Sequence, residues 1–502
     1  MEEESSRLHR SHLLMASAHT QSHVVIFPFM AQGHTFPLID LSKALAFRGL
    51  KVTIITTPSN ASSLFPKIST YPQISLSIIP FPRVAELPEG CENTANLPSM
   101  DLWVSFAKAT ENLQQPFEAV LKDMSKAGCL PICVISDFFL GWTLDTCRSF
   151  GIPRIVFHGM GVLPMLLSKT SFSHIPCIMA SSYSDPIPFP EVKIPFTLNR
   201  TDFPDLPRWI DPTDPFSRAV WEAGEGDVNS WGVIVNSFEE LEGDYVAGLE
   251  SFYITKGAKA WCVGPVLLYD QIQQETLVSD RSHNGNQSDP YIKWLDEIGE
   301  SGRLVMYVSF GTQAHISDAQ MDEIAHGLEM AGEPFIWVIK SITWVPPDRW
   351  EERVKERGLI VKDWVEQRCI LAHPAIGGFL RHCGWNSVLE SLSNGVPLLA
   401  WPIGNDQPLN AKFVVDGLGA GVWVPQTSVG REEIVTVGCG LICDGVKELM
   451  GGLQGKKARE TAQILRTKSR RAVEKGGSSD KKLDELIECL TRRQKENTED
   501  IL

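Results

Sequence analysis

The sequence predicts an α/β protein made of two doubly wound domains, each built on a parallel sheet covered by helices. Three observations support this fold class. The chain has 502 residues, which is more than one hydrophobic core ordinarily serves. Short apolar runs alternate with helix-length segments along most of it, and one polar stretch near the middle interrupts the alternation. Because ligands of such folds bind at the carboxyl ends of strands, functional residues are expected in the loops that follow strands.

The first half of the chain carries a regular alternation of strands and helices. After the first strand, an amphipathic helix is predicted near residues 37–48, and Gly49 ends it. Buried strands are predicted at residues 23–29 (HVVIFPF), 51–57, 131–136, 154–157 and 232–236. These elements define an N-terminal domain over residues 23–265. Residues 1–22 are charged and lack a continuous apolar core, so a disordered extension is expected there rather than a signal peptide.

The second half repeats the pattern after a polar interruption. Residues 279–290 (SDRSHNGNQSDP) are polar and contain glycine, and they mark a linker predicted over residues 266–300. Strands are expected at residues 303–310, 334–339, 358–364, 377–383 and 396–401. They define a C-terminal domain over residues 301–480, followed by a charged helical tail over residues 481–502.

Composition excludes several classes of function. The formal net charge of -15 disfavours nucleic acid and anionic membranes as partners. No apolar run is long enough to span a bilayer, which, with the absence of a signal-like segment, predicts a cytoplasmic protein. The eleven cysteines show no metal-ligand spacing, so reduced thiols are expected and neither a metal site nor a cofactor is predicted. The oligomeric state does not follow from the sequence.

One strand-to-helix turn has the composition of an anion site. Residues 377–383 form a predicted strand, and the chain then turns through Gly384, Trp385, Asn386 and Ser387 into a helix. Such a turn exposes backbone N–H groups at the positive end of the helix dipole, which suits a diphosphate. Asn386 and Ser387 add side-chain donors, and His382 stands at the strand end beside them.

Glu390 lies on the same face of this predicted helix as Ser387. Its carboxylate is placed to accept hydrogen bonds from ribose hydroxyls. The pattern Ser387-x-x-Glu390 is equally that of a capping box, which many ordinary helices use. Both interpretations stay open on this pattern alone.

Residues 364–407, a stretch of 44 positions containing HCGWNSxxE, resemble the plant secondary product glycosyltransferase box. This box is the signature of plant UDP-dependent glycosyltransferases, and similarity extends to residues 27–34, 261–265, 294–296 and 308–312. The resemblance implies the GT-B fold, in which two Rossmann-like domains face each other across a cleft.

The resemblance also implies roles for individual residues in binding a UDP-sugar. Trp364 is expected to stack on uracil, with backbone contacts at Val365, and Gln367 and Glu390 to bind the ribose. The phosphates are expected to contact His382, Asn386, Ser387 and Thr312 around the turn at Gly384, and the sugar hydroxyls to face Trp385, Asp406 and Gln407. Trp385 and the terminal Gln407 resemble enzymes that use UDP-glucose, whereas a terminal His is associated with galactose.

Two positions depart from the family pattern. Where the family commonly has Trp-Ala-Pro-Gln, this chain has Val365 and Glu366 between Trp364 and Gln367. Arg381 stands where a small Ser or Thr commonly precedes the histidine. Its side chain has two possible positions, in solvent or in the phosphate pocket, and the sequence does not decide between them.

A catalytic base is predicted at His34, in the loop that leaves the first strand. An acceptor hydroxyl must lose its proton as it attacks the anomeric carbon, and histidine has a pKa near neutrality. Asp137 follows the strand at residues 131–136 on the same sheet edge, where it is placed to orient the histidine; a helix N-cap is its alternative role. The matching residues of the family form this catalytic pair. Direct displacement with inversion is expected, with UDP leaving against the helix dipole of the second domain.

The acceptor is expected to lie against residues 59–100 and 181–208, which are rich in Pro, Phe and Leu and suit a flat aromatic or terpenoid compound. The sequence therefore predicts transfer of glucose from UDP-glucose to a hydroxyl or carboxyl of a small hydrophobic secondary metabolite or hormone, such as a flavonoid or phenolic. Two alternatives are a nucleotide-sugar epimerase and a non-catalytic UDP-sugar-binding protein. The presence of both His34 and Asp137 favours the transferase.

Overall fold

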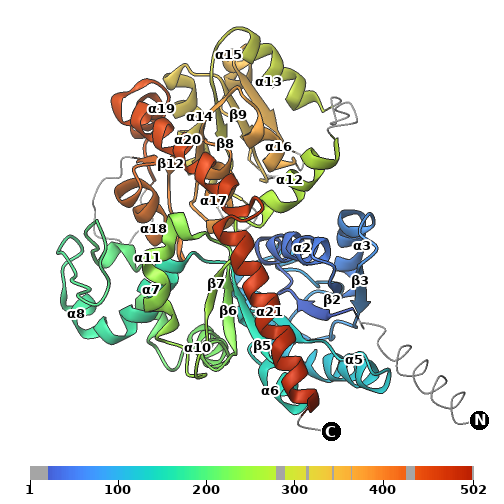
Figure 1. Ribbon diagram of the computed structural model, residues 1–502. Coiled ribbons are helices and arrows are strands. Elements are labelled where there is room, and N and C mark those ends of the chain that lie inside the picture. The colour runs from blue at the N-terminus through green and yellow to red at the C-terminus, as the bar shows by residue number, and fades with distance from the viewer. Residues whose placement is uncertain are drawn as a thin grey trace, which may run out of the picture.

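The computed structural model describes residues 21–278, 289–311, 316–341, 344–362, 365–424 and 436–499. In this part of the chain, two parallel sheets each form the centre of one half, and the halves stack on one another (Figure 1). The two α/β halves predicted from the sequence are confirmed. Residues 1–20 of the predicted extension and residues 279–288 of the predicted linker lie outside the described residues.

The first sheet has seven parallel strands in the order β3-β2-β1-β4-β5-β6-β7. The strands are β1 (His23–Phe27), β2 (Lys51–Thr56), β3 (Ile74–Ile78), β4 (Cys133–Asp137), β5 (Arg154–His158), β6 (Gly232–Val235) and β7 (Ala260–Cys262). The helices of this half are α2 (Gln32–Phe47), α3 (Pro58–Ile68), α4 (Trp103–Glu111), α5 (Gln114–Lys126), α6 (Thr143–Ser149), α7 (Val162–Ser171), α8 (Ile175–Ala180), α9 (Leu206–Trp209), α10 (Pro215–Val228) and α11 (Glu239–Glu250). Strands β1, β4, β5 and β6 are buried at every residue, as a parallel sheet covered on both faces requires.

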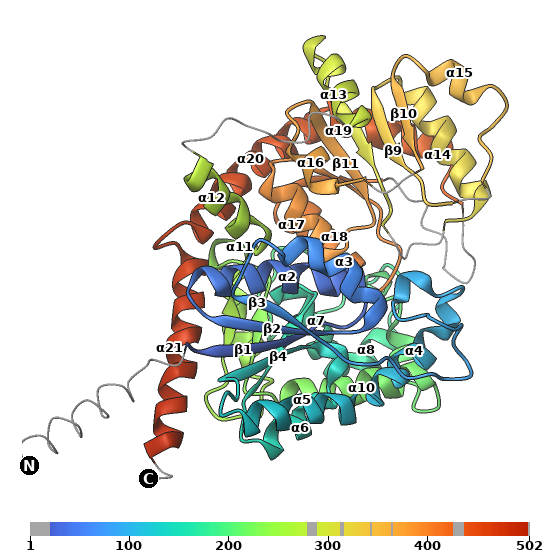
Figure 2. The ribbon, with the colours of Figure 1, turned by 90° about the vertical axis from the view of Figure 1, so that its right-hand side faces the viewer.

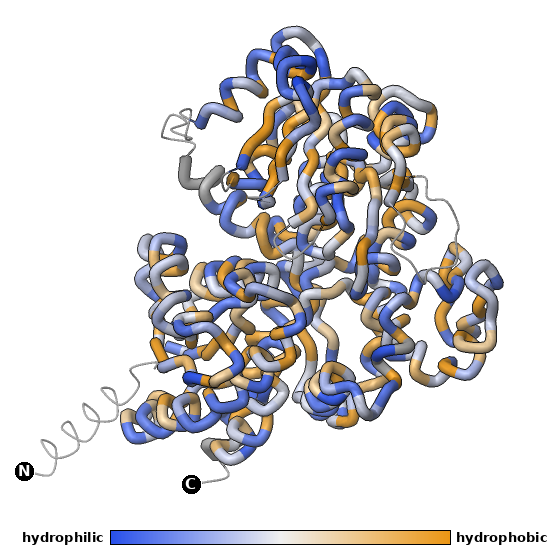
Figure 3. The backbone as a smooth tube through the Cα atoms, turned by 180° about the vertical axis from the view of Figure 1, so that it is seen from behind, coloured by the Kyte–Doolittle hydropathy of each residue, from blue (hydrophilic) through white to orange (hydrophobic). Residues whose placement is uncertain are grey.

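The second sheet has six parallel strands in the order β10-β9-β8-β11-β12-β13. The strands are β8 (Val305–Val308), β9 (Phe335–Val338), β10 (Gly358–Val361), β11 (Ile376–Arg381), β12 (Leu398–Ala400) and β13 (Gly421–Trp423). The helices are α12 (Leu267–Val278), α13 (Pro290–Glu300), α14 (Asp318–Ala331), α15 (Trp350–Val354), α16 (Gln367–Ala372), α17 (Trp385–Ser393), α18 (Gln407–Lys412), α19 (Cys439–Gly451), α20 (Leu453–Val473) and α21 (Ser478–Glu499). Hydrophobic residues concentrate on the strands, and hydrophilic residues lie mainly on the outer helices and loops (Figure 3).

The structure corrects several sequence-predicted elements. Helix α2 begins at Gln32, five residues before the predicted start, so His34 lies in a helix rather than in a loop. Strands β3, β7 and β13 were not predicted, and residues 266–300 contain helices α12 and α13. Strand β3 and all but the first residue of helix α3 also fall inside residues 59–100, which were expected to be acceptor-binding loops. Short edge strands such as β13 have too few residues for a clear apolar pattern.

The C-terminal helix α21 returns to the first half of the molecule and runs along it beside β7 (Figures 1 and 2). Arg48, at the end of α2, forms ion pairs with Asp480 and with Asp484, the latter at 2.7 Å. Ser479 Oγ donates to the carbonyl oxygen of Gly264 at 2.5 Å. The last helix therefore ties the second half of the chain to the first. Among the described residues, none of the helices is both long and apolar enough to cross a bilayer.

Candidate active site

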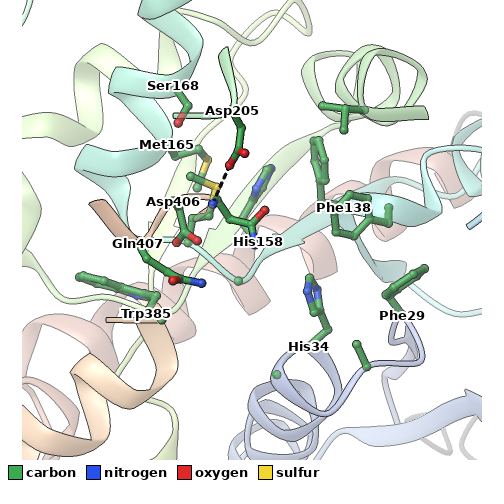
Figure 4. Close-up of a pocket in the computed structure, with 18 of the residues that line it drawn as sticks. Phe29, His34, Phe138, His158, Met165, Ser168, Asp205, Trp385, Asp406 and Gln407 are labelled. Atoms are coloured by element: carbon green, nitrogen blue, oxygen red, sulfur yellow. Dashed lines mark hydrogen bonds between the residues drawn. The ribbon is translucent and has the colours of Figure 1, made fainter. Parts of the chain in front are cut away.

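A cavity of about 850 Å³ lies between the carboxyl ends of the two sheets (Figure 4). Its wall contains residues that follow β1, β4 and β5 in the first half and residues that follow β11 and β12 in the second. This is the location that open parallel sheets favour for ligands.

His34 and Asp137 meet at the edge of the first sheet. Strands β1 and β4 are parallel neighbours in which Phe27 pairs with Ser136, so the residues that follow them lie side by side. His34 Nδ1 is 2.7 Å from Asp137 Oδ2. The Asp137 side chain is fully buried, whereas 26% of the His34 side chain is exposed. Because Asp137 occupies Nδ1, Nε2 is the nitrogen of His34 that remains for a ligand in the cavity.

The two carboxylate oxygens of Asp137 have different partners. Oδ2 contacts His34, and Oδ1 accepts a hydrogen bond from the backbone N–H of Phe139 at 3.0 Å. Asp137 is therefore also the N-cap of the short turn that follows β4. Asp137 thus makes both of the contacts that the sequence offered as alternatives, and the cap fixes the orientation of the carboxylate toward His34.

Arg154 supports the backbone of Asp137 from behind, a role that the sequence did not indicate. Its buried guanidinium donates from Nη2 to the carbonyl oxygen of Asp137 at 2.9 Å. The other donors bind Ser136 Oγ (2.7 Å), Thr143 Oγ1 (3.0 Å), Ser230 Oγ (2.7 Å) and the carbonyl oxygen of Gly226 (2.9 Å). A guanidinium whose donors are satisfied in this way holds the end of β4 rigidly.

The electrostatics of His34 suit a base near neutral pH. Burial lowers the pKa of His34. The charge of Asp137 and its hydrogen bond, with a smaller contribution from Asp406, together raise the pKa by more than burial lowers it. The net pKa of His34 lies above its ordinary value. Asp406 belongs to the second half of the chain, so residues of both halves set the basicity of this imidazole.

Helix α17 of the second half docks onto the helix that carries His34. Pro37 lies inside α2 and has no N–H, so it cannot bond the carbonyl four residues earlier, that of Gly33. That carbonyl accepts a hydrogen bond from Asn386 Nδ2 instead. The proline therefore leaves a backbone acceptor available to the other half of the molecule, next to His34.

The turn between β11 and α17 is tight and strained. Cys383 has φ of 65°, in the left-handed region that residues other than glycine rarely adopt. A Cβ added at Gly384 would lie 2.9 Å from His382 Nε2, so a larger residue here would force the imidazole to shift. Helix α17 begins at Trp385 with Gly384 as its N-cap, and its first N–H groups lie at this turn.

Buried polar atoms without hydrogen-bond partners gather at this turn. Among the described residues, His382 Nδ1 and Asn386 Oδ1 have none. Burial, and then the charge of Arg381, lower the pKa of His382 well below its ordinary value, so its imidazole is neutral at pH 7. Unsatisfied buried groups at a helix N-terminus are typical of a site that receives a polar ligand.

Glu390 takes part in a chain of contacts that reaches α2. Gln367 Nε2 donates to Glu390 Oε2 at 2.6 Å, and Arg368 Nε donates to Glu390 Oε1 at 3.1 Å. Arg368 Nη2 donates to Asp40 Oδ2 of α2 at 2.7 Å. The capping-box alternative for Glu390 is wrong, because α17 begins two residues before Ser387 and Glu390 bonds side chains of α16. Ser387 Oγ accepts from Gln367 Nε2 at 3.3 Å.

Trp385 joins the two halves at the cavity wall. Its indole N–H donates to the backbone carbonyl of Asn236, at the end of β6, at 2.8 Å. A Cβ added at Gly161 would lie 2.8 Å from Trp385 Cζ2, so the ring packs tightly against the start of α7. Because the N–H has this partner, Trp385 presents the ring rather than a hydrogen-bond donor to the cavity.

Asp406 and Gln407 lie across the cavity from His34 (Figure 4). Gln407 Oε1 accepts from the backbone N–H groups of Ile403 at 2.9 Å and Gly404 at 3.1 Å. This anchors the amide, and within the described ranges its Nε2 remains available as a donor. Asp406 Oδ2 accepts from Asn410 Nδ2 at 2.8 Å, and burial raises the pKa of Asp406.

The part of the cavity that belongs to the first half is aromatic. It is lined by Phe29, Trp103, Phe138, Phe139, Phe216 and Trp221. The two segments expected to bind the acceptor contribute less than predicted: Thr94, Ala95 and Met100 from residues 59–100, and Asp205 and Arg208 from residues 181–208. The aromatic residues were missed because apolar side chains after strands resemble core residues in sequence.

Two predicted donor-site residues, Thr312 and Trp364, lie outside the described residues. Val365 is described and buried, next to the start of α16. The structure brings the other predicted residues to one region: Gln367, His382, Gly384, Trp385, Asn386, Ser387, Glu390, Asp406 and Gln407 all lie on or beside the loops after β10, β11 and β12.

Comparisons with known proteins agree with this architecture. Residues 280–446 match a family model described as "UDP-glucoronosyl and UDP-glucosyl transferase". The chain is 36% identical to scopoletin glucosyltransferase of Nicotiana tabacum over 484 residues, covering 94% of this chain and 98% of the relative. It is 37% identical to UDP-glycosyltransferase 90A1 of Arabidopsis thaliana over 496 residues, covering 95% and 98%.

Solved structures of similar fold are also plant enzymes. Glycyrrhiza uralensis UGT73P12, complexed with glycyrrhetinic acid 3-O-monoglucuronide, superposes with a TM-score of 0.82 at 29% identity, covering 96% of this chain and 98% of that one. Phytolacca americana UGT2, complexed with UDP-2fluoro-glucose and pterostilbene, gives a TM-score of 0.75 at 26% identity, covering 94% and 100%.

Proposed function

The chain belongs to the plant UDP-glycosyltransferase family, and we propose that it transfers glucose from UDP-glucose to a hydroxyl of a small hydrophobic acceptor. The observation that carries this proposal is the His34–Asp137 pair, 2.7 Å apart, in the same cavity as the turn between β11 and α17. One half supplies a base, and the other supplies a cradle for a nucleotide diphosphate.

The proposed reaction is a single displacement with inversion. His34 Nε2 takes the proton of the acceptor hydroxyl while the acceptor oxygen attacks the anomeric carbon. The bond between that carbon and the β-phosphate oxygen breaks, and UDP leaves with the electron pair. The N–H groups at the start of α17 stabilise the negative charge that develops on the leaving phosphate. Asp137 stabilises the imidazolium that forms at His34.

Glucose is proposed as the sugar because of the polar groups opposite His34. The Gln407 amide is held by two backbone N–H groups, so its Nε2 donor has a fixed direction. Asp406 supplies carboxylate oxygens beside it. A donor and acceptors in fixed positions recognise the pattern of hydroxyl groups on a sugar ring, and a site built on such bonds discriminates strongly between hydroxyl configurations.

The acceptor is proposed to be an aromatic or terpenoid secondary metabolite, on the basis of the aromatic cavity wall. Relatives are named for, or crystallised with, molecules of this kind: scopoletin, pterostilbene and a glycyrrhetinic acid glucuronide. We extend only the chemical class, a flat or fused-ring hydrophobic molecule with a hydroxyl, to this chain. The scheme gives no role to a metal ion, so activity in the presence of EDTA is expected to equal that without it.

A mixed panel of phenolic, flavonoid and hormone acceptors incubated with UDP-glucose tests the proposal, with products detected by mass as addition of one hexosyl unit. His34→Ala is the control for catalysis, and calorimetric binding of UDP-glucose is measured for both proteins. A product that forms only with the unchanged enzyme supports the transferase. Binding of UDP-glucose without any product favours a non-catalytic UDP-sugar-binding protein, and absence of binding refutes the donor assignment.

A further inference from the structure

Arg381 is the last residue of β11, and its side chain turns inward. Only 8% of the residue is exposed, and it lines the cavity next to His382. Its Nη1 donates to the carbonyl oxygen and the hydroxyl of Ser309, both at 3.1 Å, and to Gln367 Oε1 at 3.4 Å. Of the two positions that the sequence left open, the structure therefore shows the one in the pocket.

The buried charge of Arg381 has no counter-charge within the part of the chain that the structure describes. Its partners are neutral oxygens, and its Nε has no hydrogen-bond partner there. The carboxylate of Glu390 acts on it from a distance, and the oxygens of that carboxylate bond Gln367 and Arg368. Burial lowers the pKa of Arg381, because a guanidinium removed from water loses the solvation of its charge. A buried cation without a counter-charge destabilises a fold, so folding alone does not explain this residue.

The guanidinium points toward the region where other anion-binding features converge. A Cβ added at Gly311 would lie 2.9 Å from Arg381 Nη2 and 3.1 Å from His382 Cε1, and Gly311 has φ of 85°. Glycine at this position therefore lets the guanidinium and the imidazole approach the loop after β8. His382 Nδ1 has no partner among the described residues, and the N-terminus of α17 follows three residues later.

The geometry points to Arg381 as a binding residue for the diphosphate of the nucleotide donor, with that anion supplying the missing counter-charge. The diphosphate is the anionic part of a UDP-sugar, and a guanidinium fork binds phosphate oxygens through two donors at once. This inference rests on the proposed function and deepens it, because it assigns part of the donor affinity to a position where the family commonly has an uncharged Ser or Thr.

Two variants separate the charge of Arg381 from its volume: Arg381→Met keeps most of the volume and removes the charge, and Arg381→Lys keeps the charge without the fork. Calorimetry measures the affinity of each protein for uridine, UMP and UDP. We expect Arg381→Met to weaken UDP binding about 10- to 100-fold, the loss of a hydrogen bond to a charged group, and to leave uridine binding unchanged. For Arg381→Met, the loss of UMP affinity should lie between the losses for uridine and UDP. For Arg381→Lys, the loss of UDP affinity should be smaller than for Arg381→Met.

Thermal unfolding provides a second readout that a purely structural role would not reproduce. Replacing a buried unpaired cation with an apolar residue of similar volume is neutral or stabilising. We therefore expect Arg381→Met to unfold at the same or a higher temperature than the unchanged protein without nucleotide. Saturating UDP should then raise the unfolding temperature of Arg381→Met less than that of the unchanged protein, because the variant gains less binding free energy from UDP.

Two results would overturn the inference. Equal losses of uridine and UDP affinity would show that Arg381 only supports the fold of the site, and unchanged UDP affinity in both variants would show that it does not contact the ligand. Failure of the proposed function is distinguishable from either result, because in that case the unchanged protein itself would bind neither UDP nor UDP-glucose.

Discussion

Replacing Asp137 with Asn tests the assignment of the catalytic base most directly. The amide keeps the size of the side chain, and its Oδ1 retains the N-cap to Phe139, so the turn after β4 should stay folded. What changes is the partner of His34: a buried carboxylate at 2.7 Å becomes a neutral amide.

The expected loss in kcat follows from two effects. A buried hydrogen bond between charged groups contributes about 1.5–3 kcal/mol, and it stabilises the imidazolium that forms in the transition state. This alone corresponds to roughly a 10- to 150-fold decrease. An amide N–H facing Nδ1 also favours the tautomer with its proton on Nε2, which cannot act as the base. We therefore expect kcat to fall about 10²- to 10⁴-fold, with little change in the affinity for UDP-glucose.

The pH dependence gives a second, independent expectation. Asp137 raises the pKa of His34 above its ordinary value, and the base acts in its neutral form, so activity is lost as the pH falls through the folded-state pKa. In Asp137→Asn the acid limb of kcat should move to lower pH. The sign for stability is opposite: a raised pKa stabilises the fold below the unfolded-state pKa, and this contribution disappears as the pH rises through the folded-state pKa.

Steady-state kinetics across pH, with an acceptor identified in the panel, measure both quantities, and Asp101→Asn in an exposed turn is a matched control. The assignment of His34 and Asp137 as base and partner would be contradicted if the acid limb lay at the same pH in Asp137→Asn and in the unchanged enzyme. A kcat reduced less than about 10-fold in Asp137→Asn would contradict it as well.

Three further substitutions test other parts of the site. Arg154→Met should lower the free energy of unfolding, measured by urea denaturation, by about 3–5 kcal/mol, because it leaves buried acceptors and carboxylates without their cation. A loss under about 1 kcal/mol would contradict this expectation. Gln407→Glu keeps the anchored oxygen but removes the Nε2 donor, so kcat/KM for UDP-glucose should fall about 10-fold or more while UDP affinity stays constant; equal losses would exclude a sugar contact. Gly161→Ala should destabilise the protein by about 1–3 kcal/mol in thermal unfolding, because its Cβ would overlap Trp385, whereas Gly440→Ala, with open space around it, should not.

The alternation of apolar strands and helices was readable because it is local and repeats along the chain. Predicted strands such as residues 51–57 and 154–157 differ from β2 and β5 by a single residue at one end. The juxtaposition of His34 and Asp137, 103 positions apart, could also be anticipated. Parallel strands end at the same sheet edge, so residues after two neighbouring strands must lie close together.

Contacts between the halves could not be read in the same way. Asn386 bonding Gly33, Trp385 bonding Asn236 and Arg368 bonding Asp40 each join residues more than 140 positions apart, in different halves of the molecule. No periodicity encodes such contacts, because they depend on how two separate sheets are placed against each other.

The sequence by itself determined the α/β class, the division into two halves and the strand-to-helix turn at residues 382–387, since each follows from local patterning and helix chemistry. Only the tertiary structure decided that Arg381 points into the cavity, that the Trp385 N–H donates to the backbone of the other half, and that α21 returns to the first sheet. A side chain's direction and partners are set by packing against residues distant in sequence, and the burial that makes an unpaired charge costly exists only once the chain has folded.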